Sequence, residues 1–475
     1  MRRWHKVGAA AGVVVLACVG YGTLDVYDVV PGVLTRQDAA PQPVPQPRHT
    51  ATTDPVEPPA APSAPKALPA LQGSQPVAAK VRSLLKKPLA SNNLTSKVAV
   101  TVRDATTGAH LLDKNADKAM TPASVTKLLS AWAIAHTMDL SKPLTTKVVK
   151  GRTGHVVLVA GGDTALNPGK GDPEKVDGHA GLADLAGQVA AAVKESGRTN
   201  VTLDYDVSYA PGPFTVPGWE PGFLTEGYTT RIAQLGLSTE RADPPQPSAA
   251  NPNTDTQRAL AKDLRAKGLT VKLGGKVVTA PGSAVLGKVE SSPLVDVLGM
   301  AMRDSDDAMI ESLTRQAAFK DGVPGDNKSV THWVVRTLKN AGFDMTGVHL
   351  GDVCGLAAGT TIPARVLGDV LTSGTDGSSP AYRRVLAQLP VGGWNGTLYD
   401  RFLQTTNDSA AGLVRAKTGS LNEVSSLAGT VVDKDGRLLV FAIIANGNFP
   451  RGVWSTRAAI DDVVAKLATC GCNRS

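Results

Sequence analysis

The chain has 475 residues, a length that predicts about three folded units rather than one small module. Hydrophobic residues make up 42% of it and charged residues 19%, which excludes a mainly disordered chain. Aromatic residues are scarce at 4%, and the formal net charge of +8 comes from basic residues that form no run longer than a pair. These two features disfavour base-stacking modules and phosphate-tracking grooves, so we expect no nucleic-acid partner.

The first 40 residues predict export. Arg2, Arg3 and Lys6 precede an unbroken apolar stretch, 7–20, that is long for the core of a signal peptide and short for a membrane-spanning helix. No clear cleavage site follows this stretch. We therefore expect 1–40 to be a signal peptide or an uncleaved signal anchor, which places the protein outside the cytoplasm, either anchored in the membrane or secreted to the cell wall.

A proline-rich linker is predicted at 41–75. Prolines follow one another closely through 41–70, a composition typical of an extended, semi-rigid polyproline helix. Such a linker holds a folded domain away from a membrane.

The four cysteines are too few for a disulfide scaffold. Cys470 and Cys472 are separated by one residue near the end of the chain. Three interpretations stay open: a local disulfide between them, a pair of free thiols, or a bond from one of them to Cys354.

The folded part is predicted to begin with a hairpin and a buried helix. Strands are expected at 98–102 and 109–112, joined by a turn. The run that follows Pro122 is apolar on all sides, so a buried helix is expected to begin at or near Ser124.

The middle of the chain has a different residue pattern. Between about 142 and 285, short β-branched segments are broken by Gly, Pro and Asp, which favours an independent β-rich region. We expect 146–285 to form one or two inserted β-rich domains.

The last part of the chain predicts helices and then a hairpin. Apolar periodicity indicates helices at 293–302 and 308–318, and a closing helix at 456–467. Before that last helix, 426–432 and 438–444 are predicted to form a hairpin across a glycine turn.

Strands at both ends of the folded part, with helices between them, predict one α+β domain whose sheet is completed by both ends of the chain. Its two halves are expected at 76–145 and 286–470, and 471–475 is left as a tail.

The sequence offers little support for a metal site or for histidine-based catalysis. The eight histidines are scattered, with no His-Glu-x-x-His pair, so we expect no metal and no cofactor. The Gly-x-Ser-x-Gly elbow and the phosphate-loop pattern are also absent. A Ser-His-Asp triad stays open, because triads are assembled in space.

Three short motifs carry the chemistry. They are, in chain order, Ser124-Val-Thr-Lys127, Ser305-Asp-Asp307 and Lys417-Thr-Gly419. Each is weak alone, and Ser83-Leu-Leu-Lys86 is a second match to the first of them. The order of the three, each in a fitting context, is far more specific.

The motifs describe an activated serine. Residues three apart share a helix face, so Ser124 Oγ and Lys127 Nζ can meet. Lysine acts as a base only if burial or a second cation lowers its pKa, and Lys417 could be that cation. Ser305 could relay a proton between the two lysines, and the amides of Ser124 and Ser420 could form an oxyanion hole. The alternative is that both lysines are solvated and Ser305 caps a helix.

From about 76 to 470 the sequence resembles the penicillin-binding D-alanyl-D-alanine carboxypeptidases and endopeptidases of low-molecular-mass class C, which are serine peptidases related to β-lactamases. The resemblance implies a β-lactamase/transpeptidase-like catalytic domain, split by a long insertion between the first two motifs. Besides the three motifs, the matching segments are Thr121-Pro-Ala-Ser124, Gly161-Gly-Asp-Thr-Ala-Leu166, Asp352-Val-Cys-Gly-Leu356 and Leu389-Pro-Val-Gly-Gly-Trp-Asn-Gly-Thr-Leu398.

The resemblance also implies roles for individual residues. Ser124 would attack the carbonyl between two terminal D-alanines of a peptidoglycan stem peptide, and Lys127 would take its proton. Lys417, Thr418, Gly419 and Ser420 would bind the peptide and its carboxylate. Penicillin and other β-lactams would acylate the same serine as substrate analogues that are released slowly.

This chain departs from the family pattern at two positions. Asp307 stands where the family has Asn in the substrate-binding motif, and Cys354 stands where a serine is usual. An ionised aspartate only accepts hydrogen bonds, and its charge raises the pKa of Lys127. The hypothesis is a turnover that is weakened or moved to higher pH. The alternatives are a wall-binding protein of the same fold with little turnover, and a β-lactamase or esterase.

Overall fold

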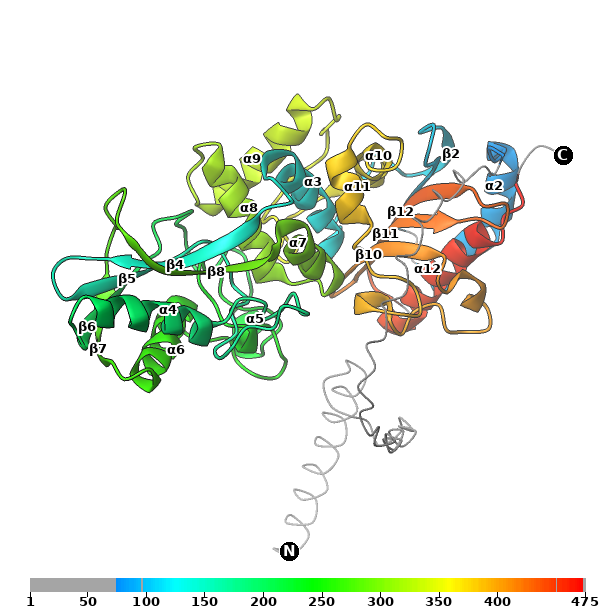
Figure 1. Cartoon of the computed structure of the whole chain (residues 1–475). Helices are drawn as coiled ribbons and strands as arrows, with labels where there is room; N and C mark the ends of the chain where they lie inside the picture. The colour runs from blue at the N-terminus through cyan, green and yellow to red at the C-terminus, as the bar shows by residue number, and fades with distance from the viewer. Residues whose placement is uncertain (1–73, 95–96, 450, 473–475) are drawn as a thin grey trace, which may run out of the picture. The chain divides into compact units, whose positions relative to one another are not determined.

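The computed structural model describes residues 74–94, 97–449 and 451–472, and all of these residues belong to one compact unit (Figure 1). The predicted export segment, 1–40, and nearly all of the predicted linker, 41–75, lie outside the described residues. Among the residues that are described, no helix is both long enough and apolar enough to cross a membrane.

A five-stranded antiparallel sheet forms the first of two layered regions. Its strand order is β10-β11-β12-β1-β2, so strands from the beginning and the end of the folded chain lie side by side. This confirms the predicted α+β fold with a sheet completed from both ends. The strands are β1 (Lys97–Asp104), β2 (His110–Lys114), β10 (Val414–Leu421), β11 (Val424–Val432) and β12 (Leu438–Asn446).

The central strands are buried on both faces, which is why their sequences are nearly continuous apolar runs. In β12 the side chains of Leu439, Phe441 and Ile443 enter one hydrophobic core, and those of Val440 and Ala442 enter the other. This alternation follows from the two-residue period of a strand. The sheet therefore separates two cores, and helices must cover both faces.

One face is covered by the two ends of the folded chain and the other by a group of helices. Helices α2 and α12 pack against the first face (Figure 1). On the other face α10 contacts β1 and β12, and α3 lies among α8, α9, α10 and α11. The helices of this region are α2 (Ala78–Lys86), α3 (Lys127–Thr137), α7 (Leu294–Arg303), α8 (Asp307–Lys320), α9 (Asn327–Asn340), α10 (Ala364–Ser373), α11 (Pro380–Leu386) and α12 (Gly452–Ala468).

Most predicted elements of this region are confirmed. The first hairpin, the two middle helices, the last hairpin and the closing helix all occur at the expected places. The helix expected at Ser124 begins with a tight 3₁₀ turn, and its regular α-helical part starts at Lys127. Short 3₁₀ turns are η1 (Pro88–Ala90), η2 (Ala123–Thr126), η3 (Ser238–Glu240), η4 (Gly396–Leu398) and η5 (Asp408–Ala410), and a two-stranded ribbon joins β3 (Ala119–Met120) to β9 (Ile362–Pro363).

A second five-stranded sheet occupies the middle of the sequence. Its order is β7-β6-β5-β4-β8, with parallel pairs between β5, β6 and β7 and antiparallel pairs on both sides of β4. Its own hydrophobic core is formed with α4 and α6. The elements are β4 (Pro143–Lys150), β5 (His155–Val159), α4 (Leu182–Glu195), β6 (Asn200–Asp206), α5 (Pro221–Thr225), α6 (Pro252–Ala266), β7 (Thr270–Lys276) and β8 (Val285–Pro293).

The sequence predicted strands here but not the two long helices. Both helices are amphipathic, and α6 is capped by the preceding Asn251, whose side chain accepts a hydrogen bond from the amide of Thr254. The chain enters and leaves the sheet on paired residues, Pro143 and Pro293. This pairing agrees with an insertion between the two parts of the α+β domain. The predicted limits of the inserted region, 146–285, stay a prediction.

The structure decides among the cysteine interpretations. Cys470 and Cys472 form a local disulfide, and Cys354 is a free, buried thiol. A bond to Cys354 is therefore wrong, since its sulfur donates a hydrogen bond to Asp352 instead.

Candidate active site

Ser124 lies in the 3₁₀ turn that leads into α3. Ala123 before it has a positive φ of 52°, and the hydroxyl of Thr126 donates to the carbonyl of Ala123 at 2.8 Å, which closes the turn. Because Lys127 follows three residues later, its Nζ lies on the same side and donates to Ser124 Oγ at 2.9 Å. The structure thus brings the serine and the lysine of the first motif together.

Lys127 is completely buried and bound on three sides. Besides Ser124, its ammonium contacts a carboxylate oxygen of Asp307 and donates to the carbonyl of Cys354 at 3.0 Å. Asp307 is the first residue of α8, so the second motif reaches the first through an ion pair.

The second motif also meets the third. Lys417, on β10, is completely buried and donates to Ser305 Oγ at 2.8 Å and to the carbonyl of Thr418 at 3.0 Å. Ser305 lies between α7 and α8 with a φ of 60°, a left-handed conformation that is uncommon for a residue with a side chain. All three motifs therefore converge, although long stretches of chain separate them.

Gly419 allows β10 to approach the nucleophile turn. A Cβ at this position would lie 2.6 Å from the carbonyl oxygen of Pro122 and 3.1 Å from the amide nitrogen of Ser124. The hydroxyl of Ser426, on the neighbouring strand, donates to the same carbonyl at 2.6 Å. Glycine is required here because any side chain would push the strand away from Ser124.

The strand beside Ser124 is the outer strand of its sheet. β11 pairs with one side of β10, and Pro390 and Gly392 bond to the other side at Ala416 and Val414. Among the described residues, these backbone hydrogen bonds to the outer side of β10 end at Ala416, just before Lys417. From Lys417 onward, the outer edge of β10 is available to pair with an extended peptide.

The hydroxyls next to Lys417 are held by neighbouring elements. Thr418 Oγ1 donates to Thr397 Oγ1 at 2.9 Å, and the guanidinium of Arg457, from α12, donates to Ser420 Oγ at 3.0 Å. Together with Lys417, these groups make a region of hydrogen-bond donors suited to a carboxylate.

The two buried lysines have opposite electrostatics. Burial lowers the pKa of Lys127, but the charge and hydrogen bond of Asp307, together with Cys354 and Asp352, outweigh burial, and the pKa lies above its ordinary value. Burial also lowers the pKa of Lys417, and there the positive charge of Lys127 adds to the effect, so this pKa lies well below its ordinary value. Lys127 is thus held charged, and Lys417 is the amine that loses its proton more easily.

Behind Lys127 lies a buried acidic cluster formed by Glu311, Asp352 and Cys354. Their ligand atoms lie within 4.8 Å of one another, the one arrangement among the described residues that approaches a metal site. Asp352, however, already accepts bonds from the amides of Gly355 and Ala357 at 2.6 and 2.7 Å, and from the Cys354 thiol. Its oxygens fix the loop whose Cys354 carbonyl binds Lys127, so the cluster supports the lysine.

Burial raises the pKa of Glu311 to about 8, and the charge of Asp352 acts in the same direction. The Glu311 carboxyl accepts a hydrogen bond from the amide of Val353 at 2.8 Å. No motif predicted a role for Glu311, although this residue lies one helical turn after Asp307 on α8. That spacing is the signal that could have found it.

Two other residues were also without a predicted role. Thr397 belongs to one of the matching segments, but its contact with Thr418 follows from the packing of η4 against β10. Arg457 comes from the far end of the chain and carried no motif. Ser83 and Lys86, the second match to the Ser-x-x-Lys motif, are exposed on α2, away from the three motifs.

The fold is that of penicillin-binding protein 4. A crystal structure of penicillin-binding protein 4 from Haemophilus influenzae matches with a TM-score of 0.63 at 20% identity, over 82% of this chain and 98% of that chain. A second structure of that protein, in complex with a β-lactam, matches with a TM-score of 0.59 at 19% identity, over the same share of each chain.

The chain belongs to the D-Ala-D-Ala carboxypeptidase 3 (S13) family, whose pattern it matches at 78–244 and 240–467. Carboxypeptidase DacB of Mycolicibacterium smegmatis is 34% identical over 425 residues, which cover 88% of this chain and 90% of the relative. A carboxypeptidase of Mycobacterium tuberculosis is 34% identical over 406 residues, covering 84% and 85%. The protein is therefore a serine-type D-Ala-D-Ala carboxypeptidase, which confirms the function predicted from its motifs.

Proposed function

We propose that Ser124 is the nucleophile of this carboxypeptidase and forms an acyl-enzyme with the penultimate D-alanine of a peptidoglycan stem peptide. The observation that carries the proposal is the 2.9 Å contact between Ser124 Oγ and the buried Lys127 Nζ, beside the strand of the Lys417 motif. Attack by Oγ breaks the peptide bond, D-alanine leaves, and water then releases the shortened peptide.

Lys127 is the base that takes the Ser124 proton, and it must first become neutral. The ion pair with Asp307 opposes this. Lys417 has the lower pKa, so it is the neutral amine of the pair and has a free lone pair for the Lys127 proton, with Ser305, hydrogen-bonded to Lys417, as the relay. The transfer runs against the order of the two pKa values until a negative charge next to Lys417 raises the pKa of that amine. The transfer leaves Lys127 neutral and Lys417 charged, and the carboxylate of a bound substrate next to Lys417 favours the transfer.

The carboxylate of the terminal D-alanine binds to Lys417, Thr418 and Ser420. A buried amine, two hydroxyls and the Arg457 guanidinium gather at this end of β10, which supports the assignment. Gly419 allows the strand to pair with the peptide beside Ser124, and the amides of Ser124 and Ser420 are the oxyanion donors. Asp307 faces the substrate as an acceptor, so it selects an N–H where an asparagine would also donate to a carbonyl.

The substrate places the protein outside the cytoplasm, because D-Ala-D-Ala ends occur on peptidoglycan stem peptides. β-Lactams are proposed as covalent inhibitors that acylate Ser124, and the β-lactam complex of the Haemophilus influenzae relative supports this. Attachment to the membrane through 1–40 stays a prediction, because that segment lies outside the described residues.

The test uses the chain from residue 74 onward, a labelled penicillin and a stem-peptide mimic ending in D-Ala-D-Ala. Mass spectrometry should find the adduct on Ser124, and D-alanine should be released from the mimic. Ser124→Ala should abolish both, and Ser83→Ala should change neither. An adduct elsewhere would refute the nucleophile; a stable adduct without D-alanine release would favour a binding protein, and fast penicillin hydrolysis a β-lactamase.

A further inference from the structure

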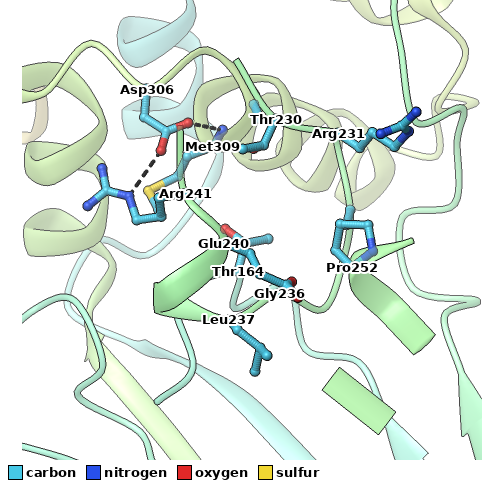
Figure 2. A pocket seen from close by; sticks show the side chains of 12 residues that line it. Thr164, Thr230, Arg231, Gly236, Leu237, Glu240, Arg241, Pro252, Asp306 and Met309 are labelled. Carbon is cyan, nitrogen blue, oxygen red and sulfur yellow. Dashed lines mark hydrogen bonds and ion pairs between the residues drawn. The ribbon is translucent and has the colours of Figure 1, made fainter. Parts of the chain in front are cut away.

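Arg241, in the middle region of the chain, contacts three carboxylates at once. Its Nε lies 3.2 Å from Asp306, one Nη lies 3.4 Å from Asp304, and the other lies 3.7 Å from Asp177. Figure 2 shows Arg241 and Asp306 pointing toward each other. The side chain of Arg241 is 20% exposed and that of Asp306 only 7%, so this interaction is largely shielded from water.

Two of these carboxylates flank Ser305. Asp304 and Asp306 lie on either side of it, and the left-handed conformation of Ser305 stores strain that the surroundings must hold in place. Asp306 also caps α8 by accepting from the amide of Met309 at 2.8 Å. Arg241 therefore holds the turn that aims Ser305 at Lys417 and starts the helix whose first residue binds Lys127.

The same helix has further bonds to the middle region. Ser312 donates to the carbonyl of Ala233 at 2.8 Å, and Gln316 donates to the carbonyl of Gly162 at 3.1 Å. A Cβ at Gly162 would lie 2.1 Å from the Gln316 side chain, which shows how closely the segments approach. The middle region therefore runs along α8, and Arg241 lies at the catalytic end of that contact.

The cavity next to Arg241 does not account for the arrangement. It measures about 20 Å³, which is room for about one water molecule. Arg241 is instead engaged with the protein itself. A planar guanidinium holds two carboxylates in a fixed relative position, which a lysine, as a point charge, does less well.

We propose that Arg241 is a positioning residue for the carboxypeptidase reaction, through which the predicted insert holds the Ser305-Asp-Asp307 motif in its active geometry. The proposal rests on the roles proposed above for Ser305 and Asp307. It gives the middle region a part in catalysis that does not require any contact with substrate.

The experiment compares Arg241→Met and Arg241→Lys with a matched control, Arg231→Met. Arg231 lines the same cavity but donates to the carbonyls of Ser248 and Ala249 within the middle region. The acylation rate constant and the dissociation constant for a labelled penicillin are measured separately, together with the melting temperature. We expect Arg241→Met to lower the rate constant about 10- to 100-fold with little change in the dissociation constant.

Arg241→Lys should recover part of the rate, and Arg231→Met should stay within about twofold of the wild type. A folded Arg241→Met variant with the wild-type rate overturns the proposal, and so does an equal loss in the Arg231 control. If Arg241→Met does not fold, Arg241→Lys and Asp304→Asn decide, and wild-type rates in both overturn it. A wild type that forms no adduct on Ser124 refutes the proposed function instead, so the two failures are distinguishable.

Discussion

Lys127 and Lys417 are both completely buried, lie close enough to influence each other, and differ in what surrounds them. Lys127 contacts Asp307 and lies in front of the acidic cluster, whereas Lys417 contacts a serine hydroxyl and a backbone carbonyl. Burial is therefore the same for both and the local charge is not. The comparison teaches that burial alone does not make a lysine a base, because Asp307 and the acidic groups behind it together reverse the direction of the pKa shift.

The largest expected effect separates the two lysines by activity. Lys127→Met removes the proposed base, and acylation of Ser124 should fall by about 10³-fold or more. Lys417→Met removes the proton acceptor and one carboxylate contact, and the loss should be about 10²-fold. Acylation by a labelled penicillin, followed over time, measures both. Equal losses would contradict the distinct roles.

Stability should separate the lysines as well. Lys127→Met leaves the Asp307 carboxylate buried without its partner, a change that typically costs about 3–5 kcal/mol, less what Asp307 recovers by taking a proton. Lys417→Met replaces an amine held only by neutral groups, and we expect a change within about 1 kcal/mol. Unfolding in urea gives both free energies. If the Lys417 variant is the less stable of the two, the buried charge that depends on a lysine does not lie at Asp307, and the comparison is wrong.

Glu311 tests the acidic side of the comparison. Its pKa is raised to about 8, so between the ordinary value near 4.5 and pH 8 the folded protein keeps a proton that the unfolded chain has lost. Glu311 should therefore make the free energy of unfolding fall with rising pH in that window, contributing about 1.4 kcal/mol per unit at most. The raised pKa values of Asp163, about 6, and Glu240, about 7, add to the slope at the acidic side of the window, so the contribution of Glu311 is clearest between pH 7 and 8. Glu311→Gln should reduce the slope there, while Glu195→Gln, at an exposed helix end, should keep it. A wild type whose stability is flat across the window would rule out the effect.

The smallest expected effect concerns the ion pair itself. Asp307→Asn removes the charge that raises the pKa of Lys127, so the rising limb of the acylation profile should move to lower pH. Asp255→Asn, at a similar position in the first turn of α6, is the control and should leave the profile unchanged. Identical profiles for the wild type and the Asp307 variant would remove this explanation.

The sequence predicted the parts of the fold that depend on local pattern. The apolar runs of β11 and β12 and the helical period of α12 are signals contained within a single element. The helices α4 and α6 were missed because β-branched segments on both sides of them dominated the interpretation of that region. The apolar face of α4 and the Asn-Pro sequence at the start of α6 are nevertheless signals from which both helices could have been predicted.

For the site, the order of the motifs predicted which residues meet, and Ser124, Lys127, Ser305 and Lys417 do lie together in two hydrogen-bonded pairs. What the sequence could not supply is contact between distant segments that carry no motif. Arg241 and Arg457 reach the site only because of how the second sheet and α12 pack. Their charges, like most surface charges, have no sequence pattern that marks them.

The pairing of Pro143 with Pro293 has a consequence for engineering. Since the middle region leaves and rejoins the rest of the chain at adjacent strand ends, a short turn is enough to close the gap if everything between them is removed. Such a truncated enzyme would keep the three motifs in sequence and the core beneath α2 and α12, but the core around α3 would lose Leu144, Ala165, Val216, Trp219 and Ile232. The corresponding segment of another family member could then be inserted at the same two residues. The acylation rate of that chimaera would show whether the inserted segment supplies an arginine that acts as Arg241 does.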